Sequence, residues 1–437
     1  MASSTDAVAV FWFRRDLRLH DNAGLYHALR SGYKVLPVFI FDSDILDKLD
    51  NKEDRRLTFI HQEVERLNRE LRQEWKSGLK VYHGKPIGVY RQLLKDFAIK
   101  TVFCNRDYEP YARQRDKEIY EFLNSEGVSL KGYKDQVIFD KYEVVKDDGK
   151  PYTVYTPYMR KWKSRLHDFY LRSYPTLKYA ENFLQLDEQQ LPPLEEMGFT
   201  TVEFDFPTRD IDQEVINTYH KTRDVPAIKG TSRMSLHLRF GTVSIRELAR
   251  VGQQENEKYF NELIWRDFYQ MILYHFPHTV ENSFRPAYDH IRWENKEEYF
   301  HKWKEGKTGY PLVDAGMREL STTGFMHNRI RMVVASFLTK HLLIDWRWGE
   351  AWFAEKLLDY EQASNVGGWQ WAAGSGVDAA PYFRVFNPAL QLQKFDPDYK
   401  YVKQYVPEYG TAHYPEPIVD HKEARERAIQ RFKEALS

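Results

Sequence analysis

The chain has 437 residues, and its 64 Lys and Arg residues balance 64 Asp and Glu residues, so the formal net charge is zero. This length predicts two or three domains, no apolar run is long enough for a membrane-spanning helix, and the single cysteine, Cys104, excludes a disulfide framework, a cysteine zinc site and an iron–sulfur cluster. Because the start of the chain has no signal-peptide pattern, we expect a cytoplasmic protein, and any nucleic-acid partner would need a local basic patch.

The first third of the chain alternates apolar runs with helical patterns. Apolar runs at 7–13, 35–41, 79–82 and 101–104 predict buried strands, and residues 57–75 and 87–97 have helical periodicity. This alternation predicts an α/β domain over residues 1–131, built on a doubly wound, Rossmann-like parallel sheet. The turn after the first strand, residues 14–18, contains no glycine, which excludes a conventional dinucleotide-binding turn there.

The rest of the chain changes character twice. Residues 132–206 collect prolines and lose periodicity, so we expect a connector there, whereas residues 207–437 predict a large all-α domain. Eight of the 11 tryptophans lie between residues 265 and 371. Such a cluster suits a planar ligand, stacked bases or an electron path, and a bulky core is the plain alternative. No zinc-binding motif is present in the sequence, so we predict no metal site.

Residues 260–269 predict a helix with two different faces. The apolar stripe consists of Phe260, Leu263, Ile264 and Phe268. The other face carries Glu262, Trp265, Arg266 and Tyr269. A carboxyl group beside a tryptophan suits a proton donor, because the apolar ring excludes water from the carboxyl group and so raises its pKa. A solvated pair between Glu262 and Arg266, four residues apart, is the commoner alternative.

Three further stretches carry candidate site residues. After a break at Gly324, the residues Asn328, Arg331 and Met332 share a helix face, while His327 lacks a partner at metal-ligand spacing and is expected to be structural. Residues 359–371 contain two glycines that allow close approach to a ligand, and Trp369 and Trp371 lie on nearly opposite helix faces. Residues 230–235 place small hydroxyls and Arg233 at a predicted helix start, which suits a diphosphate, with an ordinary N-cap as the alternative.

In this order and spacing, the stretches resemble the FAD-binding helical domain of the photolyase/cryptochrome family. More narrowly, the chain is similar to class I photolyases, which repair cyclobutane pyrimidine dimers. The similarity runs from residues 13–18, Phe-Arg-Arg-Asp-Leu-Arg, to Asn387-Pro388, and so covers essentially the whole chain. It implies light-driven DNA repair, in which photoexcited reduced FAD gives an electron to a flipped-out dimer, the cyclobutane ring opens and the electron returns.

The resemblance also implies roles for individual residues at the cofactor. The segment that holds the FAD diphosphate and ribitol would contain Tyr219, Thr231, Ser232, Arg233, Met234 and Ser235. Asn328 would touch both adenine and substrate, Arg331 and Asp359 would pair beside the isoalloxazine, and Asn365 would accept a hydrogen bond from flavin N5. Glu262 and Arg266 are also expected at the cofactor. The residues that would carry electrons from the surface to the flavin are Trp369, Trp346 and Trp303.

The implied partner is UV-damaged DNA that contains cyclobutane pyrimidine dimers, bound by a monomer without membrane contact. Glu262 would be protonated and donate to a thymine carbonyl as the substrate becomes a radical anion. The walls of the substrate pocket would include Trp265, Met332 and Trp371. The rim arginines expected to meet phosphates are Arg223, Arg266, Arg329 and Arg384.

Members of the same family that have other functions carry other residues at the positions of the predicted substrate pocket, or a longer C-terminal tail. Enzymes that act on the six-four photoproduct use a histidine pair where this chain has Asn328 and Met332. DASH cryptochromes often have Gln at the position of Met332, and a signalling cryptochrome typically appends a long tail after the 422–436 helical pattern. We keep a blue-light-sensing cryptochrome, including the DASH type, as the alternative function.

A second, antenna chromophore is a further expectation from the resemblance. Tyr111 and Ala112 stand where folate-binding relatives carry Asn and Glu, so residues 105–113 favour a deazaflavin or a flavin over methenyltetrahydrofolate. The absence of an antenna stays open.

Overall fold

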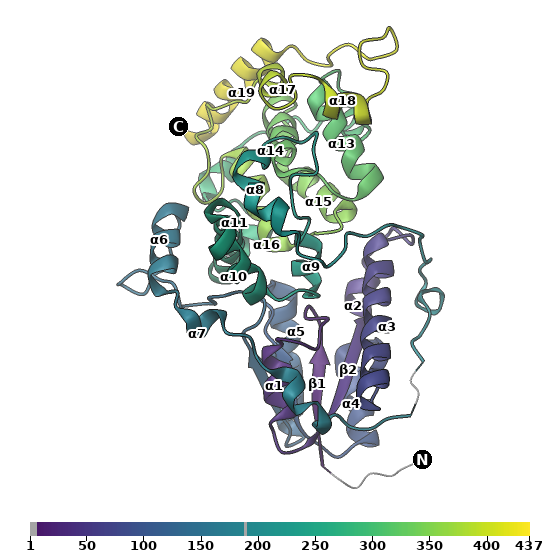
Figure 1. Cartoon of the computed structure of the whole chain (residues 1–437). Helices are drawn as coiled ribbons and strands as arrows, with labels where there is room; N and C mark the ends of the chain where they lie inside the picture. Colours follow the sequence, from purple (N-terminus) through teal and green to yellow (C-terminus); the bar gives the residue numbers. More distant parts are fainter. Residues whose placement is uncertain (1–6, 188–189) are drawn as a thin grey trace. The chain divides into compact units, whose positions relative to one another are not determined.

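The computed structural model describes residues 7–187 and 190–437, which form two compact units (Figure 1). The first unit contains the chain up to Asp140 together with Leu166–Ile211 and Arg233–Val251. The second contains Lys141–Arg165, Asp212–Ser232 and Gly252–Ser437. The boundaries expected at residues 131 and 206 therefore differ from the observed division, because the supposed connector contributes to both units and a segment beyond residue 233 packs with the first.

The first unit is built on the expected parallel sheet. Its five strands lie in the order β3-β2-β1-β4-β5, and every neighbouring pair is parallel. The strands are β1 (Val8–Phe13), β2 (Lys34–Asp42), β3 (Lys80–Gly84), β4 (Ile99–Asn105) and β5 (Ser129–Tyr133). The sequence pattern missed β5, because the residues of this short edge strand, Ser-Leu-Lys-Gly-Tyr, contain no apolar run.

Helices cover both faces of this sheet. The helices of the first unit are α1 (Ala23–Leu29), α2 (Ser43–Leu46), α3 (Arg55–Trp75), α4 (Pro86–Asp96), α5 (Pro110–Ser125), α7 (Asp168–Leu171), α9 (Ser235–Phe240) and most of α10 (Ile245–Glu255), with 3-10 turns at Thr176–Asn182 and Leu194–Met197. Val10 and Trp12 of β1 share a core cluster with Tyr90 of α4 and Ile119 of α5. On the other face, Gly24 brings α1 close to β1, since a Cβ there would lie 2.9 Å from the ring of Phe11.

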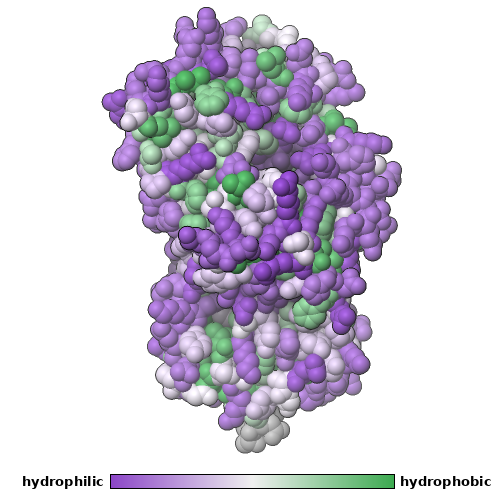
Figure 2. Space-filling view, turned by 90° about the vertical axis from the view of Figure 1, so that its left-hand side faces the viewer, coloured by the Kyte–Doolittle hydropathy of each residue, from purple (hydrophilic) through white to green (hydrophobic). Residues whose placement is uncertain are grey.

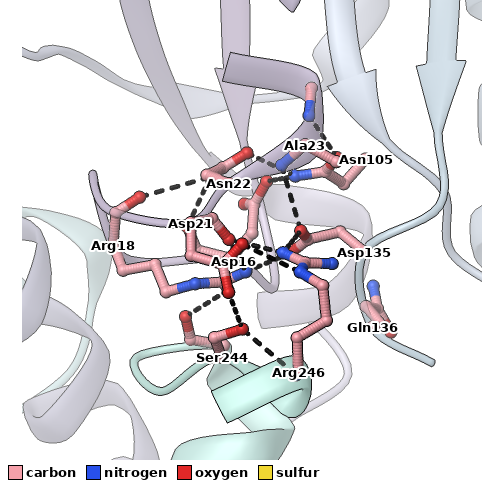
Figure 3. Close-up of polar contacts among 12 residues, drawn as sticks. Asp16, Arg18, Asp21, Asn22, Ala23, Asn105, Asp135, Gln136, Ser244 and Arg246 are labelled. Carbon is pink, nitrogen blue, oxygen red and sulfur yellow. Dashed lines mark hydrogen bonds and ion pairs between the residues drawn. The ribbon is translucent and has the colours of Figure 1, made fainter. Parts of the chain in front are cut away.

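The glycine-free turn after β1 is held by a buried polar network (Figure 3). Arg18 donates to Asp135 at 2.6 Å, and Arg246 of α10 donates to both Asp135 and Asp21 at 2.8 Å. Burial acts to raise the pKa of Asp135, but these two arginines outweigh it and hold that pKa below its usual value. Removing one partner would leave an uncompensated buried charge, so the network fixes α10 to the first unit.

The second unit is helical, as predicted. Its helices are α6 (Tyr155–Arg165), α8 (Gln213–Thr222), α11 (Glu257–His275), α12 (Glu297–Lys304), α13 (Pro311–Thr323), α14 (Asn328–Ser336), α15 (Trp346–Lys356), α16 (Gln362–Ala373), α17 (Pro388–Phe395), α18 (Lys400–Tyr405) and α19 (His421–Leu436). Short turns lie at Pro277–Val280 and Pro286–His290, and α14 continues into a π-helical turn at Phe337–His341. One large apolar core collects residues from α12 to α18.

Charged and polar groups dominate the visible face of the molecule. Figure 2 shows hydrophilic side chains over most of it, with apolar side chains scattered among them. Within the part of the chain that the structure describes, no helix combines the length and the apolar character needed to span a membrane.

Candidate functional site

Helix α11 has the two faces that the sequence predicts. Asn256 caps its start by accepting hydrogen bonds from the N–H groups of Lys258 and Tyr259. The apolar stripe is buried and comprises Phe260, Leu263, Ile264 and Phe268. The opposite face is half-buried and comprises Glu262, Trp265, Arg266 and Tyr269. The helix therefore presents a carboxyl group beside an indole ring at the edge of the second unit's core.

Trp265, which is predicted to be a wall of the substrate pocket, stacks on a residue that the sequence did not predict. The ring of Tyr155, from α6, stacks on Trp265 with a centroid distance of 3.6 Å and an interplanar angle of 5°. The Tyr155 hydroxyl donates to the carbonyl of Asn261 at 2.9 Å, which fixes the stack to α11. One face of Trp265 is thus covered by Tyr155. No local signal marked Tyr155, because it lies in a proline-rich stretch with weak periodicity.

Glu262 pairs with Arg223 and not with Arg266. The Arg223 Nη1 donates to Glu262 Oε1 at 2.6 Å, and the two side chains are 27% and 31% exposed. Burial raises the pKa of Glu262 above its ordinary value, although Arg223 opposes that rise. The expected direction of the shift is present, whereas a solvated pair along the helix is not.

Arg266 is wrongly predicted as a rim arginine. Its guanidinium donates to Glu361 at 2.7 Å, and the side chains of the pair are only 10% and 7% exposed. Ser364 donates to the other carboxylate oxygen of Glu361 at 3.1 Å. Arg266 is thus committed to a buried ion pair between α11 and the start of α16, and it is not placed to meet DNA phosphates.

The start of α14 carries a second group of predicted residues. His327 is the N-cap, where its Nδ1 accepts from the N–H of Arg329 at 3.2 Å, so its structural interpretation is confirmed. Arg329 donates to Asp224 at 2.7 Å and contacts the sulfur of Met332 at 3.6 Å. Asn328 is exposed and Met332 is half-buried, so both lie at the surface of the unit.

The predicted ion pair between Arg331 and Asp359 is present. Arg331 Nη2 donates to both carboxylate oxygens of Asp359, at 2.9 and 3.1 Å, and its Nε donates to the carbonyl of Met326. The Asp359 side chain is 5% exposed and that of Arg331 is 27% exposed. The pair therefore has one buried anion and one cation that reaches the surface.

The amide of Asn365 is oriented by Glu350, a residue that the sequence did not predict. Asn365 Nδ2 donates to Glu350 Oε1 at 2.9 Å and to the Glu350 carbonyl at 3.1 Å. Both amide hydrogens are used in this way, so the amide oxygen is the atom left to accept a hydrogen bond. Glu350 lies on α15, fifteen positions away, where nothing in its local pattern marks it.

Glycines set how closely α16 packs. A Cβ on Gly367 would lie 2.3 Å from the ring of Tyr269, so this glycine serves packing against α11. A Cβ on Gly368 would meet no atom within 4 Å. Of the two glycines expected to admit a ligand, only Gly368 has open space where a Cβ would stand. The ring of Trp369 in turn lies 2.1 Å from the place of a Cβ on Gly349 of α15.

The predicted tryptophan chain needs a correction. Trp369 and Trp346 are 2% and 1% exposed, as inner members of such a chain would be. Trp303 is 0% exposed, its indole N–H donates to the carbonyl of Val334, and its ring centroid lies 6.1 Å from that of Trp369. A fully buried residue cannot be the surface end of the chain. Trp371, on the other side of α16, is half-buried, which fits its predicted separation from Trp369.

The segment expected at a diphosphate divides between the units. In the second unit, Ser232 hydrogen-bonds Tyr259 at 3.1 Å, and the Tyr219 ring meets that of Tyr259 edge-on, while Thr231 lies beside Ser232 in the chain. In the first unit, Arg233 has φ +53°, and Met234 is the N-cap of α9, ahead of Ser235, without a side-chain cap bond. The alternative of an ordinary Ser or Thr cap is therefore wrong.

The exposed Arg384 lies in a loop that a buried lysine holds. Lys340, in the π-helical turn, is 1% exposed and donates to the carbonyls of Tyr382 and Arg384 at 3.0 and 3.3 Å. Burial lowers the pKa of Lys340 to about 8. The loop backbone is thus anchored while the Arg384 side chain stays in solvent.

Comparisons with known proteins agree along the whole chain. Residues 9–178 match the family described as DNA photolyase, and residues 259–412 match the FAD binding domain of DNA photolyase. A deoxyribodipyrimidine photo-lyase of Halobacterium salinarum is 37% identical, over 98% of this chain and 99% of that protein. A class III photolyase from Agrobacterium tumefaciens superposes with a TM-score of 0.86 at 32% identity, covering 99% of this chain and 98% of that one. An archaeal photolyase from Sulfolobus tokodaii with two FAD molecules superposes with a TM-score of 0.83 at 34% identity, covering 98% and 99%.

Proposed function

Since the chain belongs to the DNA photolyase family, we propose that it repairs UV-damaged DNA with light by splitting cyclobutane pyrimidine dimers. The observation that carries this proposal is the half-buried face of α11, where Glu262 lies next to the Trp265 wall and Arg223 lies at hydrogen-bond distance from Glu262. A proton donor, an aromatic wall and a phosphate-binding cation are what a flipped-out pyrimidine dimer requires.

The cofactor is FAD, and the residues present fit it. The oriented oxygen of Asn365 suits the N5–H of a reduced flavin, because a neutral amide accepts this bond without taking the proton. Arg331 supplies a positive charge that Asp359 balances, which suits an anionic ring without leaving an excess of positive charge. When bound, reduced and photoexcited, FAD supplies the electron that splits the dimer.

The chain's own residues bind and orient the substrate in this proposal. The face of Trp265 that Tyr155 leaves uncovered stacks on the flipped dimer, and Trp371 and Met332 complete the walls. Asn328 contacts the cofactor and the substrate from the start of α14. The arginines that meet DNA phosphates are Arg223, Arg329 and Arg384, without Arg266. Phosphate contacts place the DNA, and the pocket selects the dimer because a damaged pair costs less to unstack.

The path that reduces the cofactor is proposed to run from Trp369 through Trp346 to Trp293. Trp293 is half-buried and packs against the same core as Trp346 and Trp369. The residues beside it bond to the segment just before Trp346: the N–H of Glu294 donates to Leu343 at 2.7 Å, and the side chain of Asn295 accepts from Asp345 at 2.8 Å. Trp293 therefore replaces Trp303 as the surface end.

A repair assay tests the proposal and separates it from the cryptochrome alternative. Purified protein with chemically reduced flavin is mixed with a duplex that carries one thymine dimer, and dimer loss is followed under blue light and in the dark. We expect repair in the light only. A flavoprotein that photoreduces but leaves the duplex dimer intact would be a light sensor, and repair confined to single strands would indicate a DASH-type protein.

We also propose that the protein acts as a cytoplasmic monomer and that any antenna is a flavin or deazaflavin. The similarity to a structure with two FAD molecules supports a flavin antenna. The absorption spectrum before and after denaturation identifies the chromophores, light scattering during gel filtration gives the mass in solution, and cell fractionation gives the location.

A further inference from the structure

Two neighbouring residues that follow α8 form ion pairs with two different helices. Arg223 bonds Glu262 of α11 at 2.6 Å, and Asp224 bonds Arg329 of α14 at 2.7 Å. Arg223 and Arg329 are both arginines to which the proposed function assigns DNA phosphates. In the protein without DNA, each guanidinium is therefore already paired with a carboxylate.

Burial is the largest influence on the pKa of Glu262 and raises it, and Arg223 is the nearest charge that opposes this rise. The charged groups around the Glu262 carboxyl are Arg223, Asp224 and Arg329. The other titratable groups that sense it are the hydroxyls of Tyr155, Tyr219, Tyr259 and Tyr269. Burial and Asp224 favour the neutral acid, whereas Arg223, through its hydrogen bond and its charge, is the strongest influence that favours the carboxylate.

A DNA phosphate competes with Glu262 for the same guanidinium. A phosphodiester carries a full negative charge and accepts the paired N–H groups of arginine in the geometry of a carboxylate. The Arg223 side chain is 27% exposed and that of Glu262 is 31% exposed, so the pair lies at the surface of the unit. If Arg223 turned to a phosphate, Glu262 would lose its closest cation while a flipped base covered it further, and both changes favour the protonated acid.

We propose that Arg223 exchanges partners when DNA binds, leaving Glu262 for a backbone phosphate, and that Glu262 then takes up one proton from solvent. The inference rests on the proposed function and adds how its proton donor is charged. The step forms one O–H bond on the Glu262 carboxylate, the proton comes from water or buffer, and nothing is oxidised or reduced. Glu262 thereby becomes a hydrogen-bond donor only when substrate is present.

Proton uptake on binding tests this exchange without using repair. The FAD-loaded full chain is titrated in the dark, near neutral pH, with a duplex that carries one thymine dimer, in two buffers of different ionisation enthalpy. We expect net uptake that approaches one proton per bound duplex, and an affinity that falls as pH rises, by at most about tenfold per pH unit. Glu262→Gln should lose both effects, because its amide neither holds Arg223 by charge nor titrates.

A matched control removes a similar ion pair elsewhere. Arg318 and Glu408 pair at 2.6 Å with side chains 22% and 29% exposed, close to the values of Arg223 and Glu262. Glu408→Gln should leave the proton uptake unchanged.

Arg223→Gln provides a second approach, because it leaves Glu262 without its cation before DNA arrives and should therefore reduce the uptake while Glu262 itself is intact.

The outcomes separate the inference from the function on which it rests. Dimer-specific binding by the parent without proton uptake would overturn the exchange and leave the repair function standing. Uptake of the same size in Glu262→Gln would also overturn it, because the proton would then go elsewhere. A parent protein that does not distinguish the dimer duplex from an undamaged one would refute the proposed function, and the inference with it.

Discussion

Glu262 is a residue at which two effects oppose each other. Burial raises its pKa, and Arg223 at 2.6 Å acts to lower it. In the proposed reaction the acid form matters, because a donor near the thymine carbonyl stabilises negative charge as it develops. A hydrogen bond to a charged group contributes roughly 1.5–3 kcal/mol, which is enough to change the competition between ring opening and unproductive electron return.

Glu262→Ala should lower the quantum yield of dimer repair severalfold while the protein still prefers dimer DNA to undamaged DNA. The yield is measured at matched flavin reduction and with saturating substrate, so that a change in affinity does not enter. Equal yields in variant and parent would remove Glu262 from the chemistry.

Helices α15 and α16 approach so closely that one position must lack a side chain. The Trp369 ring atoms lie 2.1 and 2.4 Å from the place of a Cβ on Gly349, and both belong to a ring in a packed core. Overpacking of this kind typically costs about 1–3 kcal/mol. Gly349→Ala should therefore lower the melting temperature of the flavin-free protein by several degrees.

Gly368 is the matched control on the partner helix, since a Cβ there meets nothing within 4 Å. Gly368→Ala should keep or slightly raise the melting temperature of the same flavin-free protein, because alanine favours a helix interior by about 1 kcal/mol over glycine. If both variants melted alike, the close packing at Gly349 would not be what sets the stability of this helix pair.

At the scale of helices and strands, the sequence pattern predicts features that one segment determines by itself, and it misses features that depend on contacts with residues far along the chain. Periodicity places four of the strands and both faces of α11, because each follows from the spacing of apolar residues along one segment. It misses Tyr155 and Glu350, whose stack on Trp265 and bond to Asn365 join separate helices. It also misplaces Arg266, because exposure of an arginine is set by Glu361, which lies far along the chain and which no helical period connects to it.

Over the whole molecule, charge cancels, so DNA must be held by individual contacts. The 64 basic and 64 acidic residues leave no net charge to attract DNA. Each phosphate contact should add about 0.9 to the slope of log affinity against log salt. Arg384→Ala should reduce that slope by about one contact, as measured by titrating dimer duplex at several salt concentrations. Lys117→Ala, an exposed lysine of α5 in the first unit, should leave the slope unchanged, and equal slopes in all three proteins would contradict a contact at Arg384.

The proposed tryptophan path connects the interior of the second unit to its surface, and substitutions can identify the tryptophan at its surface end. Trp346 suits a relay: its indole N–H has no acceptor among the described residues, so an oxidised ring lacks an adjacent base for its proton. Arg347 lies 4.8 Å from the Trp346 ring, but it is paired with Asp345 and Asp289, which offset its charge. A phenylalanine in place of Trp346, Trp293 or Trp303 keeps most of the packing and is much harder to oxidise than tryptophan.

Trp346→Phe should therefore block photoreduction of oxidised FAD by an external thiol, yet leave repair near the parent yield once the flavin is reduced chemically. Trp293→Phe should slow photoreduction strongly, whereas Trp303→Phe should slow it little, because Trp303 has no surface to deliver an electron from outside. Absorbance of oxidised flavin during blue illumination measures all three. A larger loss in Trp303→Phe than in Trp293→Phe would return Trp303 to the path, by way of its 6.1 Å contact with Trp369, and would require a different exit from the buried core.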